Sequence, residues 1–248
     1  QGIDTEDGNA NAVYMERASR YAMTSQLAFN LVGNHDKSSS TQALFDMIGK
    51  YNTFDAYGTT QIRGFGYKDF TDKKVRVIVL NTGDYWNIMG GCGMSYDQKD
   101  FLMRALDVPD GDWQIILLSH IPLDWNGGDY NFYSDLQAIL TAFENNKTAT
   151  ITVNSSYARG ETPSQYATYS GGTLTYRYDF RDKPKIIANI HGHIHTNKVG
   201  KLVNTDIVRI ATPNSSFNGN ASTNRYTEYG DYSITTAEAA KIAKVANS

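Results

Sequence analysis

The sequence is poor in the features that tie a protein to an oxidising compartment or to nucleic acid. Its 248 residues include one cysteine, Cys92, so no disulfide can form within the chain; a reducing compartment fits this count, although a secreted protein can also lack bridges. The net charge is -3 without a long basic run, which leaves no electrostatic footprint for nucleic acid or for an anionic membrane surface. A small phosphate-bearing substrate is compatible with that balance.

Long apolar runs are missing as well. No stretch is long enough to span a bilayer, and the first residues contain no apolar core of a signal peptide. We therefore expect a soluble chain with no membrane partner, and its compartment stays open. With 40% hydrophobic and 12% aromatic residues, the chain can bury one sizeable core, so a single domain over 1–248 is sufficient.

Short apolar runs alternate with amphipathic segments along the chain. The runs that predict strands are 27–32, 64–70, 75–80, 115–118, 186–190 and 207–211. The segments that predict helices are 11–26, 41–50 and three stretches opened by the capping pairs Ser95 with Gln98, Ser134 with Gln137, and Thr235 with Glu238. This alternation favours an α/β fold, and the hairpins make its sheets mixed. Alternating Thr and Tyr residues at about 146–182 predict a β-rich insertion.

All five histidines fall inside three short motifs, and each motif directly follows an apolar run. The motifs are Gly33-Asn34-His35-Asp36, Ser119-His120-Ile121-Pro122 and His191-Gly192-His193-Ile194-His195. Open α/β sheets build their sites at the carboxyl ends of strands, and imidazole with carboxamide or carboxylate suits Zn, Mn, Fe and similar ions. One histidine at a strand end is usually structural, whereas the set favours a metal site.

The geometry of the last motif leaves two arrangements open. His193 and His195 are two positions apart, so their side chains point to the same side if the segment is extended. If the segment is instead a turn, the pair can fork towards two adjacent ions. His191 is either a structural residue or a hydrogen-bond donor behind the ligands. Trp125, after the second motif, either lines a substrate cleft or packs within its loop.

Together the motifs resemble those of the calcineurin-like metallophosphoesterases, which include purple acid phosphatases, protein phosphatases, cyclic-nucleotide phosphodiesterases and some nucleases. Gly33-Asn34-His35-Asp36 looks like the third motif of that family, His120 marks the fourth, and Gly192-His193-Ile194-His195 looks like the last. Their order and the strands before them match too. The resemblance implies two mixed sheets sandwiched between helices and hydrolysis of a phosphomonoester or phosphodiester.

The resemblance also implies a role for each motif residue. Asn34, His120 and His193 would bind one divalent ion, such as Mn, Zn, Fe or Ni, and His195 would bind a second. His35 would face the substrate, as a proton donor to the leaving oxygen or a stabiliser of transferred charge, with Asp36 orienting its ring. The implied reaction is in-line attack on phosphorus by a metal-bound hydroxide, while both ions clamp phosphoryl oxygens.

Two family motifs are absent, Asp-x-His and Gly-Asp-x-x-Asp, which supply most ligands of one ion and the carboxylate that bridges both. We therefore expect a domain that lacks its N-terminal strands, belongs to a larger parent chain, holds at most one ion weakly, and is an inactive or weakly active fragment. The alternative is a non-catalytic binding or structural module of a larger assembly, with the insertion as its interaction surface. The coding sequence upstream of Gln1 discriminates the two.

Overall fold

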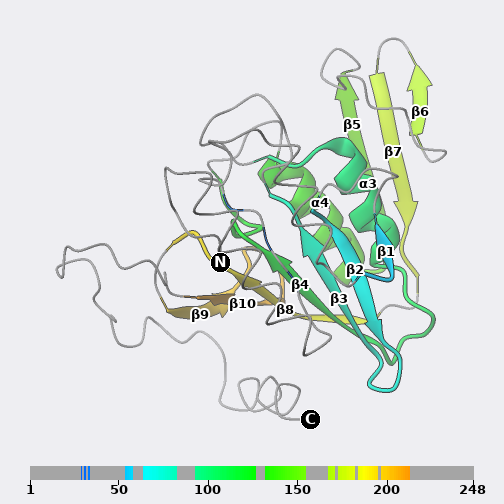
Figure 1. The fold of residues 1–248 in the computed structure, drawn as a ribbon. Coiled ribbons are helices and arrows are strands. Elements are labelled where there is room, and N and C mark those ends of the chain that lie inside the picture. Colours follow the sequence, from blue (N-terminus) through cyan, green and yellow to red (C-terminus); the bar gives the residue numbers. More distant parts are fainter. Residues whose placement is uncertain are drawn as a thin grey trace.

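A computed structural model of the chain describes residues 29, 31, 33, 54–57, 64–82, 93–126, 132–154, 167–170, 173–181, 184–194 and 197–212. This part is a mixed α/β fold with more strand than helix, and two helices, α3 and α4, are present in it (Figure 1). No helix in the described part is long and apolar enough to cross a membrane. The predicted fold class is confirmed at this level.

A seven-stranded mixed sheet carries the histidine motifs that follow β4 and β8. Its strands, in spatial order, are β1 (Ala56–Tyr57), β2 (Gly66–Phe70), β3 (Val75–Leu80), β4 (Gln114–Ser119), β8 (Lys185–His191), β10 (Val208–Ala211) and β9 (Lys198–Lys201). The central neighbours β3, β4, β8 and β10 run parallel, and the pairs at both ends are antiparallel. Every residue of β3 is buried, as expected for a strand rich in β-branched apolar residues inside a largely parallel sheet.

A separate three-stranded sheet occupies the predicted insertion. It contains β5 (Thr148–Asn154), β7 (Thr173–Asp179) and β6 (Ala167–Ser170), in the order β5-β7-β6. All its pairs are antiparallel, and its place in the chain agrees with the predicted β-rich insertion. Strands β6 and β7 are separated by two residues in the sequence, too few for the long crossover that parallel neighbours need.

The two helices begin close to the predicted places. Ser95 caps α3 (Tyr96–Ala105), and its hydroxyl accepts a hydrogen bond from the Gln98 amide at 3.2 Å. The Gln98 side chain does not complete the capping box; it bonds the backbone N–H and C=O of Asn81 at 2.7 and 2.8 Å. Helix α4 (Phe132–Glu144) begins two residues before Ser134, which therefore lies in its first turn and is not its cap.

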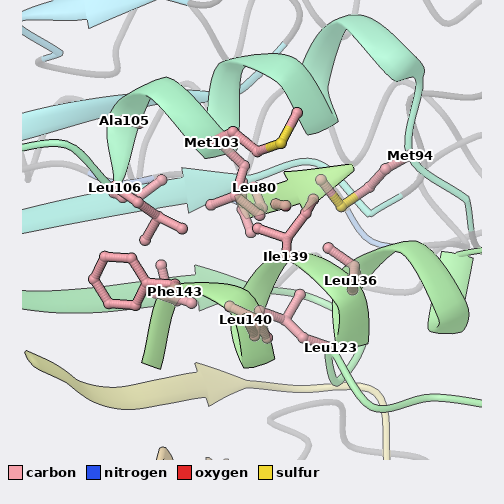
Figure 2. Close-up of a cluster of buried hydrophobic side chains, with 14 of the residues drawn as sticks. Leu80, Met94, Met103, Ala105, Leu106, Leu123, Leu136, Ile139, Leu140 and Phe143 are labelled. Carbon is pink, nitrogen blue, oxygen red and sulfur yellow. The ribbon is translucent and has the colours of Figure 1, made fainter. Parts of the chain in front are cut away.

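One hydrophobic core joins both sheets through the helices. Helix α3 contacts β3 of the large sheet and β7 of the small one. Figure 2 shows α3 side chains meeting those of α4 next to Leu80, at the end of β3. Ile151 of β5 and Tyr176 of β7 belong to the same cluster. The shared core holds the insertion against the domain, so the two sheets are packed as one unit.

Several predicted elements lie outside the described residues. These are the helices at 11–26, at 41–50 and after Thr235. Of the predicted strand at 27–32, Phe29 and Leu31 are described, and neither belongs to a strand. Phe29 instead stacks on Phe54 with ring centroids 6.2 Å apart. Strand β9 was not predicted, because Lys198–Lys201 is a polar edge strand without alternating apolar residues.

Candidate metal centre

The parallel pairing of β4 with β8 brings two histidine motifs to the same edge of the sheet. Ser119 and His191 are register partners at the carboxyl ends of these strands. One residue further, the Gly192 N–H donates to the His120 carbonyl at 3.1 Å, so the ladder continues past the strand ends. Two motifs that are far apart in sequence are therefore neighbours in the fold.

The rings of His120 and His193 lie side by side in this edge. Their centroids are 5.5 Å apart and their planes are inclined at 74°. Two imidazoles that bind one ion, with nitrogen about 2.1 Å from the metal and a tetrahedral angle, place their ring centres about 5 Å apart. Both residues are half-buried. The pair therefore fits two ligand positions of a single divalent ion.

The backbone turns at His193. Its φ is 66°, in the left-handed region, and the Ile194 N–H donates to the Gly192 carbonyl at 2.8 Å across it. This short bond closes a three-residue turn, so the extended arrangement of the last motif is excluded at His193. A left-handed residue with a side chain costs about 1–2 kcal/mol. Such strain gathers at functional sites, which makes His193 a candidate for function.

Gly192 lies against the ring of His120. A Cβ on Gly192 would lie 3.5 Å from His120 Nδ1 and 3.8 Å from His120 Cε1, both ordinary van der Waals distances. An alanine at this position therefore fits beside the ring. The close approach keeps His120 on the side of the last motif that carries His193.

Trp125 packs edge-on against the ring of His193. Its ring is perpendicular to that of His193, at 88°, with centroids 5.0 Å apart. The indole remains 37% exposed, so one face of it borders solvent beside the candidate site. An edge-to-face contact of this kind orients the imidazole.

His191 is a buried, neutral residue beneath the site. Its Nδ1 lies 2.8 Å from the Gly192 carbonyl, which can only accept, so Nδ1 carries the proton and Nε2 has no hydrogen-bond partner among the described residues. Burial lowers the pKa of His191 to about 4. The Thr212 N–H and hydroxyl both donate to the His191 carbonyl, at 2.8 and 3.2 Å. These contacts agree with a structural role in holding the turn.

Two charged residues that the sequence did not single out fix the loop after β4. The Asp124 carboxylate is 2% exposed and accepts bonds at 3.1 Å to both oxygens from the Arg209 guanidinium of β10. Its Oδ2 also accepts from the Val203 N–H at 3.2 Å. The loop that carries His120 and Trp125 is thereby tied to β10, two strands away from β4 in the sheet. The signal available in the sequence was a charged residue, Arg209, inside an otherwise apolar strand.

The other predicted site residues, Asn34, His35, Asp36 and His195, lie outside the described residues. The described residues contain no group of three or more His, Cys, Asp or Glu side chains that could hold a metal ion. The described residues thus contribute two imidazoles to the candidate centre. The positions of the third and later ligands are not defined by them.

Comparisons of the chain with protein-family models, with curated proteins and with solved structures found no match. The functional assignment accordingly rests on the sequence motifs and on the geometry of the strand ends.

Proposed function

We propose that this chain belongs to a calcineurin-like metallophosphoesterase domain, which hydrolyses a phosphomonoester or phosphodiester. The observation that carries the proposal is the His120–His193 ring pair at the ends of adjacent parallel strands. The motif resemblance assigns both residues to one ion, and the 5.5 Å spacing of the ring centroids supports that assignment. We also propose the finer fold of that family, two sheets sandwiched between helices, for the complete domain.

Each residue of the proposed site has its own role in binding the ion or the substrate. His120 and His193 would hold the ion through ring nitrogens, and Asn34 would supply an oxygen ligand to the same ion. A bound ion would supply positive charge to the phosphoryl oxygens. Trp125 orients His193 through its edge-to-face contact, and the Asp124–Arg209 pair keeps the His120 loop in place. His35, oriented by Asp36, donates a proton to the leaving oxygen.

A second ion is proposed to bind at His195 where a bridging carboxylate is available. Neither Asp-x-His nor Gly-Asp-x-x-Asp occurs in these 248 residues, and few negative charges then hold a second cation. The chain by itself should therefore bind one ion weakly and hydrolyse little substrate.

Two measurements on this chain test the proposal together. Calorimetric titration with Mn²⁺ or Zn²⁺ should show one weak site, and turnover of an aryl phosphate ester should be far below roughly 1 per second. Turnover at or above that rate would show that the catalytic core has been assigned wrongly. A chain extended by an Asp-x-His and a Gly-Asp-x-x-Asp segment, if its gene encodes one, should gain metal-dependent turnover. An extended chain that binds metal and never turns over would favour the non-catalytic module.

A further inference from the structure

A polar depression of about 420 Å³ lies where the turn after α4 meets the end of β7. Its lining residues are Asn146, Lys147, Thr148, Arg177, Asp179, Phe180 and Arg181. Three of the side chains are cations and one is a carboxylate. The whole chain has a net charge of -3, so the local positive charge of the depression is opposite in sign to the net charge of the chain.

The carboxylate in the depression is already engaged. Asp179 Oδ1 accepts a hydrogen bond from the Thr148 hydroxyl and lies 3.4 Å from the Arg177 guanidinium. The Thr148 bond, helped by Arg177 and Arg181, lowers the pKa of Asp179. Lys147 and Arg181 are exposed, and neither forms an ion pair with another described residue. Two positive charges therefore border the depression outside any ion pair among the described residues, although the charge of Asp179 acts on Arg181.

The backbone beneath these cations is tightly held. Asn146 has a φ of 51°, the Lys147 N–H donates to the Ala142 carbonyl at 2.8 Å, and the Phe180 N–H donates to the Lys147 carbonyl at 3.3 Å. Phe180 is 2% exposed and packs edge-on against Phe143 of α4. The helix end, the turn and the strand end are thus joined in one place, which pre-organises the side chains that rise from them.

We propose that this depression binds a phosphate-class oxyanion carried by a small molecule, with Lys147, Arg177 and Arg181 as its ligands. Guanidinium groups donate paired hydrogen bonds to phosphate oxygens, and an ammonium adds a point charge. The site is distinct from the metal centre. Strand β8 starts at Lys185, soon after Arg181 in the chain, and reaches His191 six residues later, roughly 20 Å away.

The test is a titration of the whole chain with inorganic phosphate and with pyrophosphate, at constant ionic strength and with a chelator present. The chelator removes metal, so binding at the proposed metal centre cannot contribute. The backbone amides of Lys147 and Phe180 should show saturable NMR shifts in the millimolar range or below, and pyrophosphate should bind more tightly than phosphate. Failure of the metal centre would leave this result unchanged.

Variants locate the site. The exposed double variant Lys147→Gln/Arg181→Gln should weaken binding roughly tenfold or more, because it removes two charge-assisted contacts. The matched control is Lys198→Gln, which removes an exposed cation from β9, outside the depression, and should leave binding unchanged. The proposal is overturned by shifts that do not saturate in the millimolar range, by full binding in the double variant, or by an equal loss in the control.

Discussion

His120 and His193 lie next to each other across the ends of two parallel strands, with ring centroids 5.5 Å apart and ring planes at 74°. The contact follows from the register that pairs Ser119 with His191, because each histidine comes just after its strand. A tight turn at His193 then directs its side chain toward His120. Short strands, a fixed register and one left-handed residue are sufficient to bring the two imidazole rings together.

A buried ion pair between the two helices should make the stability of the protein sensitive to the loss of either partner alone. The Lys99 ammonium of α3 is 1% exposed and lies 2.5 Å from the Asp135 carboxylate of α4. Lys99→Met alone should lower the free energy of unfolding by about 3–5 kcal/mol, because it leaves a buried charge unpaired. The double variant Lys99→Met/Asp135→Leu should recover most of that loss.

Urea denaturation of the single and double variants measures this coupling. Lys201→Gln is the control, since Lys201 pairs with the exposed Asp206 and should contribute less than about 1 kcal/mol. Additive losses in the double variant would show that the two charges do not stabilise each other.

Glu144, at the end of α4, should make the stability depend on pH in a defined direction. Burial raises the pKa of its carboxyl, although the Asp206 N–H donates to it at 3.0 Å. Because the folded pKa is raised, folding favours the protonated form: the contribution is fully present below the unfolded pKa, near 4.5, and is lost as pH rises through the folded pKa.

Glu144→Gln keeps an acceptor for the Asp206 N–H without the charge. At about pH 7 the variant should be more stable than the wild type by a few tenths of a kcal/mol, a value already reduced for solvent screening. The gain should disappear at about pH 4, and urea denaturation at both pH values measures it. A gain of equal size at the two pH values would show that burial of the charge is not its cause.

Much of the fold could be predicted because its signals are local. The branched apolar runs at β3, β4 and β8, the polar turn between β2 and β3, and the Ser95 cap all appear within a few residues of sequence. Parallel neighbours also place their carboxyl ends at one edge, so a shared site for His120 and His193 was a natural expectation.

The parts that were missed depend on contacts between distant segments. The capping-box pattern correctly marked Ser95, yet the Gln98 side chain bonds Asn81, which folding brings beside it. The Asp124–Arg209 pair joins a loop to a later strand and has no local pattern. Likewise, the left-handed turn at His193 and the edge of Trp125 on its ring arise from the geometry of that edge of the sheet.

His35 and His120 should fail in different ways in any form of the protein that turns over an aryl phosphate. His120→Ala should lower metal content and activity together, and added metal should restore part of the activity. His35→Ala should keep its metal and lose roughly 100-fold to 10,000-fold in rate, the scale of general acid catalysis.

The leaving group separates the two roles further. The loss in His35→Ala should shrink for substrates with good leaving groups, because they need no proton at the transition state. Rates across a series of aryl phosphates, with metal content measured on the same samples, provide the comparison. Loss of metal from His35→Ala, or an equal rate loss on every substrate, would exclude the proton-donor role.

Anomalous diffraction from crystals of this chain grown with millimolar Zn²⁺ or Mn²⁺ tests the central claim most directly. The account predicts one peak, partly occupied, about 2.0–2.2 Å from a ring nitrogen of His120 and from a ring nitrogen of His193. Crystals of the His120→Ala variant, grown under the same conditions, should lack the peak. A metal that contacts only one of the two rings, or the absence of any peak at this edge of the sheet, would contradict the proposed metal centre.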